Sequence, residues 1–175
     1  CLNEVHDDEG DKLRELAVVT NYPFFFMGDV STAMAGGLVN ACLSRRPILE
    51  AVSRSSNDIS SDATANETGR DLVQVRVALV PGMSTVTLLS LHLKSGFDED
   101  DELRRHVEAL RTKQVVEQLR AEHPGEAIVV MGDMNYDISD GAGPTFTQLP
   151  AGMPPSYRLG SDLAFPVTVD PFGAF

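Results

Sequence analysis

The feature that most constrains this chain is an apolar run that leads directly into a polar motif. Residues 128–131 are Ile-Val-Val-Met, and the next four residues are Gly-Asp-Met-Asn. Such a run predicts a strand that is buried on both faces, and Gly132 permits a tight backbone turn at its end. Asp133 and Asn135 are two residues apart, so their side chains point to one side if the chain is extended. The sequence therefore predicts a carboxylate and a carboxamide placed together at the end of a rigid core strand.

A Gly-Asp pair after a strand is often only a turn, and two other segments favour a site. Residues 88–95 form an apolar run with His92 near its end, and a short apolar piece at the start of the chain carries Glu4. Strand ends that bear a Glu, a His and an Asp-x-Asn supply the groups that a metal-assisted phosphoesterase needs. Each residue also has a plain structural alternative: Glu4 as a solvated strand end, His92 as a core histidine and Asn135 as a turn residue.

The order and spacing of these motifs resemble the endonuclease/exonuclease/phosphatase superfamily, which has the DNase I-like fold. Residues 2–5, 36–48, 92–95 and 132–135 carry the resemblance, which covers about residues 1–140. The resemblance implies an α/β (α+β) architecture, in which a two-sheet β-sandwich is flanked by helices in four layers. We expect a single domain of this kind over residues 1–175.

The chain departs from the family pattern at both ends. The family opens with a strand that carries an Asn, and it closes with a Ser-Asp-His strand that supplies a metal- or water-binding Asp and a His beside the phosphate. Here no residue precedes Cys1, and no Ser-Asp-His occurs; Ser161-Asp162-Leu163 lacks the histidine. The resemblance therefore leads us to expect an internal fragment without the first and last strands, with little hydrolytic activity on its own.

The resemblance implies a metal-dependent phosphoesterase that cuts a phosphodiester by in-line attack of an activated water. Glu4 matches the main metal ligand of the family, and Asp133 matches a residue that orients the water or shares a second ion. Two carboxylates favour a hard ion such as Mg²⁺ or Mn²⁺. Asn135 would donate to a phosphate oxygen. His92 would donate to the phosphate or the leaving group, and its ordinary pKa allows charge at neutral pH.

The expected site therefore has His92, Asp133 and Asn135 as catalytic residues, and Glu4 and Asp133 as metal ligands. The motifs define the reaction but leave the substrate open, because the family includes nucleases, sphingomyelinases, inositol-phosphate phosphatases and nucleotide-processing enzymes. A nucleic acid, a lipid head group and a nucleotide remain candidates, and a nuclease is favoured. The alternative is a non-catalytic member of the fold that serves as a binding or scaffold domain; the filled Glu, His and Asp-x-Asn positions favour the enzyme.

The net charge limits the kind of nucleic-acid binding that we expect. The chain has 26 acidic and 14 basic residues, which gives a net charge of −12. Such a charge repels polyanions at long range and argues against tight, non-specific binding of DNA. A local basic patch is still compatible with it, and residues 45–76 offer Arg45, Arg46, Arg54, Arg70 and Arg76.

Further patterns predict the surrounding elements. Residues 98–123 predict the longest helix, residues 71–80 and 85–93 predict a hairpin, and residues 38–43 and 48–52 predict a strand pair. No apolar run approaches the ~20 residues that span a bilayer. The two cysteines suggest neither a disulfide framework nor a zinc site, and Cys42 is expected to be a small buried hydrophobe.

Overall fold

The computed structural model describes residues 1–29, 37–55, 65, 68–80, 82, 84–96 and 98–135. Ser161-Asp162-Leu163 lies outside the described residues. The elements follow in the order β1 (Leu2–His6), a 3₁₀ turn η1 (Asp7–Glu9), α1 (Gly10–Val19), β2 (Phe24–Met27), β3 (Leu38–Ser44), β4 (Ile48–Arg54), β5 (Leu72–Val80), β6 (Ser84–His92), α2 (Glu99–Glu122) and β7 (Ala127–Asp133). The predicted long helix is confirmed as α2, and the predicted hairpin is confirmed as the antiparallel pair β5–β6. Among the described residues, no helix has the length and apolar character that a membrane crossing requires.

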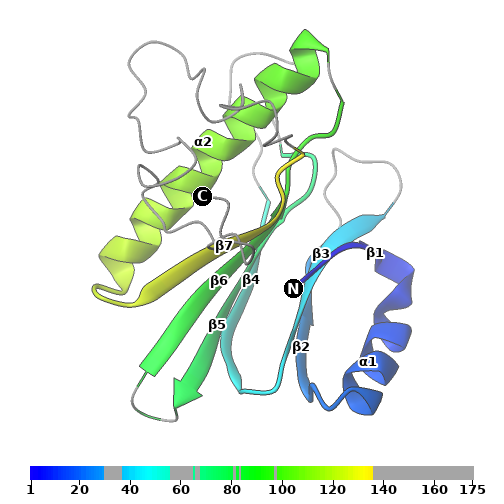
Figure 1. Ribbon diagram of the computed structural model, residues 1–175, viewed down its shortest axis with the longest axis vertical. Helices are drawn as coiled ribbons and strands as arrows, with labels where there is room; N and C mark the ends of the chain where they lie inside the picture. Colours follow the sequence, from blue (N-terminus) through cyan, green and yellow to red (C-terminus); the bar gives the residue numbers. More distant parts are fainter. Residues whose placement is uncertain are drawn as a thin grey trace, which may run out of the picture.

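The strands form two sheets that pack face to face. One sheet has the order β1-β3-β2 and the other has the order β4-β5-β6-β7. Cys42 on β3 packs against Val73 and Val75 on β5, which joins the inner faces of the two sheets. Helix α1 lies on the outer side of the first sheet and α2 on the outer side of the second (Figure 1). The expected two-sheet sandwich with helices outside is therefore confirmed.

Helix α2 is anchored by its apolar stripe and by its N-terminal cap. Leu119 and Val116 are fully buried against Leu89 of β6 and Val130 of β7. The Asp98 side chain accepts a hydrogen bond from the backbone N–H of the third helical residue, which satisfies one of the free amides of the first turn. The helix therefore shields the outer face of the second sheet from water.

The prediction of a strand pair at residues 38–43 and 48–52 is wrong, because β3 and β4 lie in different sheets. β3 pairs with β1 and β2, whereas β4 pairs with β5. The connecting residues 45–47 contain no Gly or Asn for a tight hairpin turn, and Pro47 cannot donate a backbone hydrogen bond. The chain therefore crosses from one sheet to the other at this point.

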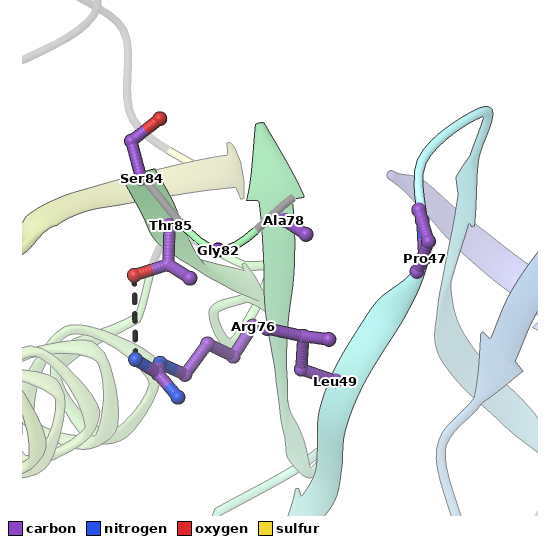
Figure 2. Close-up of a pocket in the computed structure, with 7 residues that line it drawn as sticks. All are labelled: Pro47, Leu49, Arg76, Ala78, Gly82, Ser84 and Thr85. Carbon is purple, nitrogen blue, oxygen red and sulfur yellow. Dashed lines mark hydrogen bonds between the residues drawn. The ribbon is translucent and has the colours of Figure 1, made fainter. Parts of the chain in front are cut away.

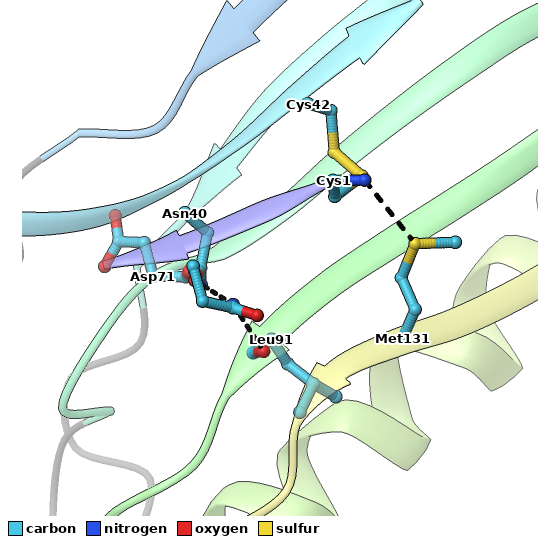
Figure 3. Close-up of a disulfide and its surroundings, with 7 residues drawn as sticks. Cys1, Asn40, Cys42, Asp71, Leu91 and Met131 are labelled. Atoms are coloured by element: carbon cyan, nitrogen blue, oxygen red, sulfur yellow. Dashed lines mark hydrogen bonds between the residues drawn. A yellow bond between two sulfur atoms is a disulfide. The ribbon is translucent and has the colours of Figure 1, made fainter. Parts of the chain in front are cut away.

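The expectation for the cysteines is also corrected, because Cys1 and Cys42 form a disulfide (Figure 3). The register of β1 on β3 pairs Leu2 with Ala41, which places Cys1 opposite Cys42. A separation of 41 residues gives no spacing signal in the sequence, since only the strand register brings the two sulfur atoms together. Cys42 is buried, as predicted. The cross-link fixes β1, which carries Glu4, onto the buried strand β3.

The second sheet brings the strand ends that carry the predicted site residues to one side of the molecule. β6 and β7 run parallel, with His92 opposite Asp133 at their ends. β5 runs antiparallel to β6, so the residues just before β5 lie at the same end of the sheet. In Figure 1 both β6 and β7 end at the upper end of the sheet. The end of β5 and the starts of β6 and β7 lie at the opposite end of the sheet.

Candidate active site

His92 lies at the centre of the candidate site. It is the last residue of β6, and its side chain is almost fully buried. Its Nε2 atom is 3.9 Å from Glu4 Oε1 and 3.8 Å from Asp133 Oδ2. Two carboxylates from opposite ends of the described chain therefore converge on one ring nitrogen.

Glu4 reaches His92 because β1 is irregular. The register of β1 on β3 shifts between Leu2 and Val5, and Glu4 itself has φ 57°. A non-glycine residue in this left-handed conformation costs about 1–3 kcal/mol, and such strain is concentrated at functional sites. The Glu4 side chain remains 61% exposed, so its carboxylate is free to bind a ligand from solution.

Asp133 is held by the turn that follows β7. Gly132 has φ 132°, and a Cβ atom there would collide with the carbonyl oxygen of Leu91, so only glycine fits. The backbone N–H of Asn135 donates to Asp133 Oδ1 at 2.8 Å, which leaves Oδ2 facing His92. The turn thus fixes the orientation of an exposed carboxylate.

Asn135 lies close by, but the extended geometry expected for it does not apply. Its φ is 48°, which breaks the alternation of side chains that an extended chain would give. Its Nδ2 atom donates to the carbonyl oxygen of Leu93 at 2.6 Å. Asn135 therefore ties the β7 turn to the end of β6, and it keeps one further amide hydrogen. Its role as a phosphate donor stays a prediction.

Arg70 is a fifth site residue that the sequence did not single out among the arginines. It lies just before β5, its side chain is 8% exposed, and its Nη2 atom is 3.8 Å from Glu4 Oε1. Its Nε atom is buried and has no hydrogen-bond partner among the described residues. The available signal was its place before a strand antiparallel to the His92 strand, which puts both residues at the same sheet end.

The surroundings of His92 favour a neutral ring. Burial lowers the pKa of His92, the Arg70 cation lowers it further, and Asp133 and Glu4 oppose the shift. The lowered pKa disfavours the protonated ring that the ordinary pKa of histidine allows. The buried Nδ1 atom has no partner among the described residues. A neutral imidazole keeps one N–H donor.

The donor set suits a hydrated hard cation. Glu4 and Asp133 offer carboxylate oxygens, while no three His, Cys, Asp or Glu residues in the described part of the chain are arranged to hold a metal ion. Mg²⁺ usually keeps several waters and binds through one or two carboxylates and the phosphate of its substrate. Two carboxylates beside a buried cation and a neutral histidine therefore fit Mg²⁺ or Mn²⁺.

A separate pocket of about 410 Å³ lies at the opposite end of the second sheet. Figure 2 shows its lining, which consists of Pro47, Leu49, Arg76, Ala78, Gly82, Ser84 and Thr85. Its one charged side chain, Arg76, is paired with Glu126 by contacts of 2.8–3.1 Å. The pocket therefore lacks the free acid–base groups that distinguish the His92 end.

Comparisons with known proteins agree with this architecture. A model of the endonuclease/exonuclease/phosphatase family matches residues 1–160. TDP2 from Caenorhabditis elegans is 18% identical with a TM-score of 0.58, and the match covers 86% of this chain and 40% of that chain. The human nocturnin catalytic domain, solved with a sulfate anion, is 18% identical with a TM-score of 0.59, covering 79% of this chain and 51% of that chain.

An endonuclease/exonuclease/phosphatase from Beutenbergia cavernae is 22% identical with a TM-score of 0.56, covering 78% of this chain and 38% of that chain. At these identities the likeness shows the fold, which is DNase I-like. This chain spans about half, or less, of the length of the solved structures that it matches. No curated protein sequence matches the chain.

Proposed function

Because the chain belongs to the endonuclease/exonuclease/phosphatase family, we propose that the protein is a metal-dependent phosphoesterase that hydrolyses a phosphodiester by in-line attack of an activated water. The observation that carries this proposal is the convergence of Glu4 and Asp133 on His92 Nε2. Three segments that are far apart in the sequence supply these groups, where β1 of the first sheet meets the ends of β6 and β7 of the second. Convergence of two exposed carboxylates on a buried histidine is typical of a site that handles charge.

The two carboxylates divide the work of holding a cation and orienting water. Glu4 would be the main ligand of Mg²⁺ or Mn²⁺, and the ion would supply positive charge against the charge that builds on the phosphate oxygens. Asp133 would share the ion or accept a hydrogen bond from the attacking water. Its orientation is set in advance by the Asn135 N–H bond to Oδ1, so little reorganisation is needed when the water attacks.

His92 and Arg70 serve the phosphate itself. A neutral His92 donates one N–H to a phosphate or leaving-group oxygen without repelling a nearby cation. Arg70, whose Nη2 atom lies 3.8 Å from Glu4 Oε1, binds a phosphate oxygen through its guanidinium group. Asn135 completes the set as a neutral donor through its remaining amide hydrogen.

The substrate class is a phosphate ester, and we favour a phosphodiester, with nuclease activity among the candidates. A lipid head group and a nucleotide are the other candidates. The net charge of −12 weakens long-range attraction to a polyanion. This charge predicts that any cleavage of nucleic acid depends on contacts at the site rather than on a broad basic surface.

Hydrolysis of bis-p-nitrophenyl phosphate tests the proposal in the complete domain that contains these residues, since residues 1–175 alone are expected to have little activity. We expect turnover with Mg²⁺ or Mn²⁺ and its loss in excess EDTA. Glu4→Gln should raise the Mg²⁺ concentration needed for half-maximal rate, whereas Glu15→Gln on the exposed face of α1 is the matched control. Full activity in excess EDTA contradicts metal dependence. A folded protein that cleaves no phosphodiester with Mg²⁺ supports the binding or scaffold alternative.

A further inference from the structure

The most unusual buried charge outside the site is Glu108, in the middle of α2. Its side chain is 3% exposed and points toward the second sheet rather than to solvent. One carboxylate oxygen, Oε1, accepts from the backbone N–H of Gly69 at 2.8 Å. The other oxygen, Oε2, accepts from the backbone N–H of Lys94 at 2.7 Å. A single side chain therefore links two chain segments that are not joined to each other in sequence.

Both segments belong to the candidate active site. Gly69 comes directly before Arg70, and Lys94 comes two residues after His92. The carboxylate of Glu108 thus lies behind the site and holds the backbone beside each of the two groups that we assign to the phosphate. Besides the two main-chain amides, Glu108 Oε1 lies 3.7 Å from Arg104 Nε on the same helix. These contacts lie behind the site, so Glu108 does not touch a substrate.

The segment after His92 has several other anchors. Leu93 N–H donates to the carbonyl oxygen of Asp133 at 2.9 Å, and the Lys94 side chain pairs with Asp101 at 2.6 Å. Arg105 Nη1 also donates to the carbonyl oxygen of Lys94 at 3.0 Å. This segment would keep much of its position without Glu108.

The Arg70 segment is held differently. The Arg70 side chain has one ion pair, at 3.8 Å to the exposed Glu4, and a buried Nε atom without a partner among the described residues. The Gly69–Glu108 bond ties the adjacent backbone to the rigid helix α2. On the other side of Arg70, the Asp71 carbonyl oxygen accepts from Asn40 Nδ2 and the Asp71 carboxylate accepts from Ser53 Oγ. Glu108 therefore anchors the backbone on the Gly69 side of Arg70.

Burying Glu108 is costly, and this cost needs an explanation. Burial raises the pKa of Glu108, while the two backbone hydrogen bonds and Arg104 oppose the rise. A buried carboxylate is a weak stabiliser of a fold unless its hydrogen bonds are all made. Two backbone amides that donate to one carboxylate fix the distance between the Gly69 and Lys94 segments. A glutamine at this position would place its own N–H donor against one of these two amides.

We propose that Glu108 is a positioning residue that sets the placement of Arg70 relative to His92 for phosphate binding. This inference rests on the proposed function, because it assigns Arg70 to the phosphate. Glu108 lies behind the site, and its effect on catalysis passes through Arg70.

A double-mutant cycle and hydrogen exchange test this proposal together. Glu108→Gln is compared with Glu117→Gln, an exposed glutamate on the same helix. We expect Glu108→Gln to speed exchange of the Gly69 amide by about 10-fold or more, and to lower kcat/KM by about 10-fold. In an Arg70→Ala background the same change should lower kcat/KM by less than about 2-fold, because residues that act together are not additive. Glu117→Gln should change neither quantity.

The outcomes separate this inference from the proposed function. Equal losses from Glu108→Gln with and without Arg70 mean that Glu108 does not act through Arg70, which overturns the inference. Unchanged exchange at Gly69 overturns it as well. If Glu108→Gln does not fold, Glu108→Asp keeps the charge but is too short to reach both amides, and it should slow catalysis in the same Arg70-dependent way. If the wild-type protein hydrolyses nothing, the proposed function fails, and the exchange rates still decide whether Glu108 holds the Arg70 segment.

Discussion

An arginine–glutamate pair lies at each end of the four-stranded sheet, but the two pairs differ in how many hydrogen-bond partners they have. At one end Arg76 Nη2 lies 2.8 Å from Glu126 Oε2, and the hydroxyls of Thr85 and Thr87 also donate to this carboxylate. At the other end Arg70 Nη2 is 3.8 Å from Glu4 Oε1, and within the described part of the chain no hydroxyl donates to the Glu4 carboxylate. The first pair is saturated with partners, whereas the second is left open to a ligand.

The pKa shifts at the two ends of the sheet also differ. Hydrogen bonds from Arg76 and the two threonines lower the pKa of Glu126 to about 2. At the other end burial and Arg70 lower the pKa of His92. Backbone strain also collects there, at Glu4 and after β7. The comparison indicates that the closed pair stabilises the sheet and that the open cluster is available for chemistry.

The largest effect that separates the two ends should come from the open cluster. His92→Ala removes a donor and Asp133→Asn removes a charge, and each should lower kcat by about 10²–10⁴-fold, as losses of acid–base or transition-state groups do. The thermal midpoint of Asp133→Asn should change little, because this side chain is 54% exposed. Steady-state kinetics and thermal unfolding measure both, with exposed Asp100→Asn as the control. Near wild-type turnover in either variant removes that residue from the site.

The closed pair should show the reverse pattern. Glu126→Gln leaves Arg76 half-buried without its counter-charge and should reduce the free energy of unfolding by about 2–3 kcal/mol. The kcat of the folded variant should equal that of the wild type. Urea unfolding and the phosphodiester assay on the same sample test this. A loss of kcat without a loss of stability would contradict the account, because it would place the active site at the Arg76–Glu126 end of the sheet.

The pH dependence of stability should trace Glu126. Its pKa of about 2 in the folded state lies below the ordinary glutamate value of 4.5, so its contribution to stability is present above about pH 4.5 and is lost as the pH falls toward 2. Between pH 5 and pH 3 the loss should be about 1–2 kcal/mol. Glu126→Gln should lack this part of the acid sensitivity. The free energy of unfolding is measured against pH in the wild type and in Glu126→Gln. Equal slopes between pH 5 and pH 3 would refute the assignment of this acid sensitivity to Glu126.

The smallest effect should come from a pair that is short but exposed. Lys12 Nζ lies 2.6 Å from Glu9 Oε1 on the surface of α1. Solvent screens such a pair, so Glu9→Gln should leave both kcat and the thermal midpoint unchanged within error. A clear drop in the midpoint would mean that contact distance, rather than burial and saturation, distinguishes the two sheet ends.

The sequence predicted the parts of the molecule that depend on local pattern. The strand end at Asp133, the helix of residues 98–123 and the β5–β6 hairpin follow from hydrophobic period and turn residues. The order of Glu4, His92 and Asp133 along the chain also identified the family. These features are encoded within short windows, where period and motif spacing carry the information.

The parts that failed depend on pairing between distant strands. The separation of β3 and β4 into two sheets, and the disulfide of Cys1 with Cys42, follow from strand register, which no local window contains. Arg70 and Glu108 were not singled out for the same reason, since a buried cation and the helix carboxylate behind it become recognisable only when the sheet end is assembled. The lowered pKa of His92 likewise follows from burial and from Arg70.

The central claim is that the open cluster, and not the saturated one, binds the phosphate. The direct measurement is kcat/KM for bis-p-nitrophenyl phosphate, at saturating Mg²⁺, in Arg70→Ala and in Arg76→Ala. Removing a charged donor to phosphate should lower kcat/KM of Arg70→Ala by about 10-fold or more, while folded Arg76→Ala stays at the wild-type value. Equal values in the two variants, or a larger loss in Arg76→Ala, would contradict the account.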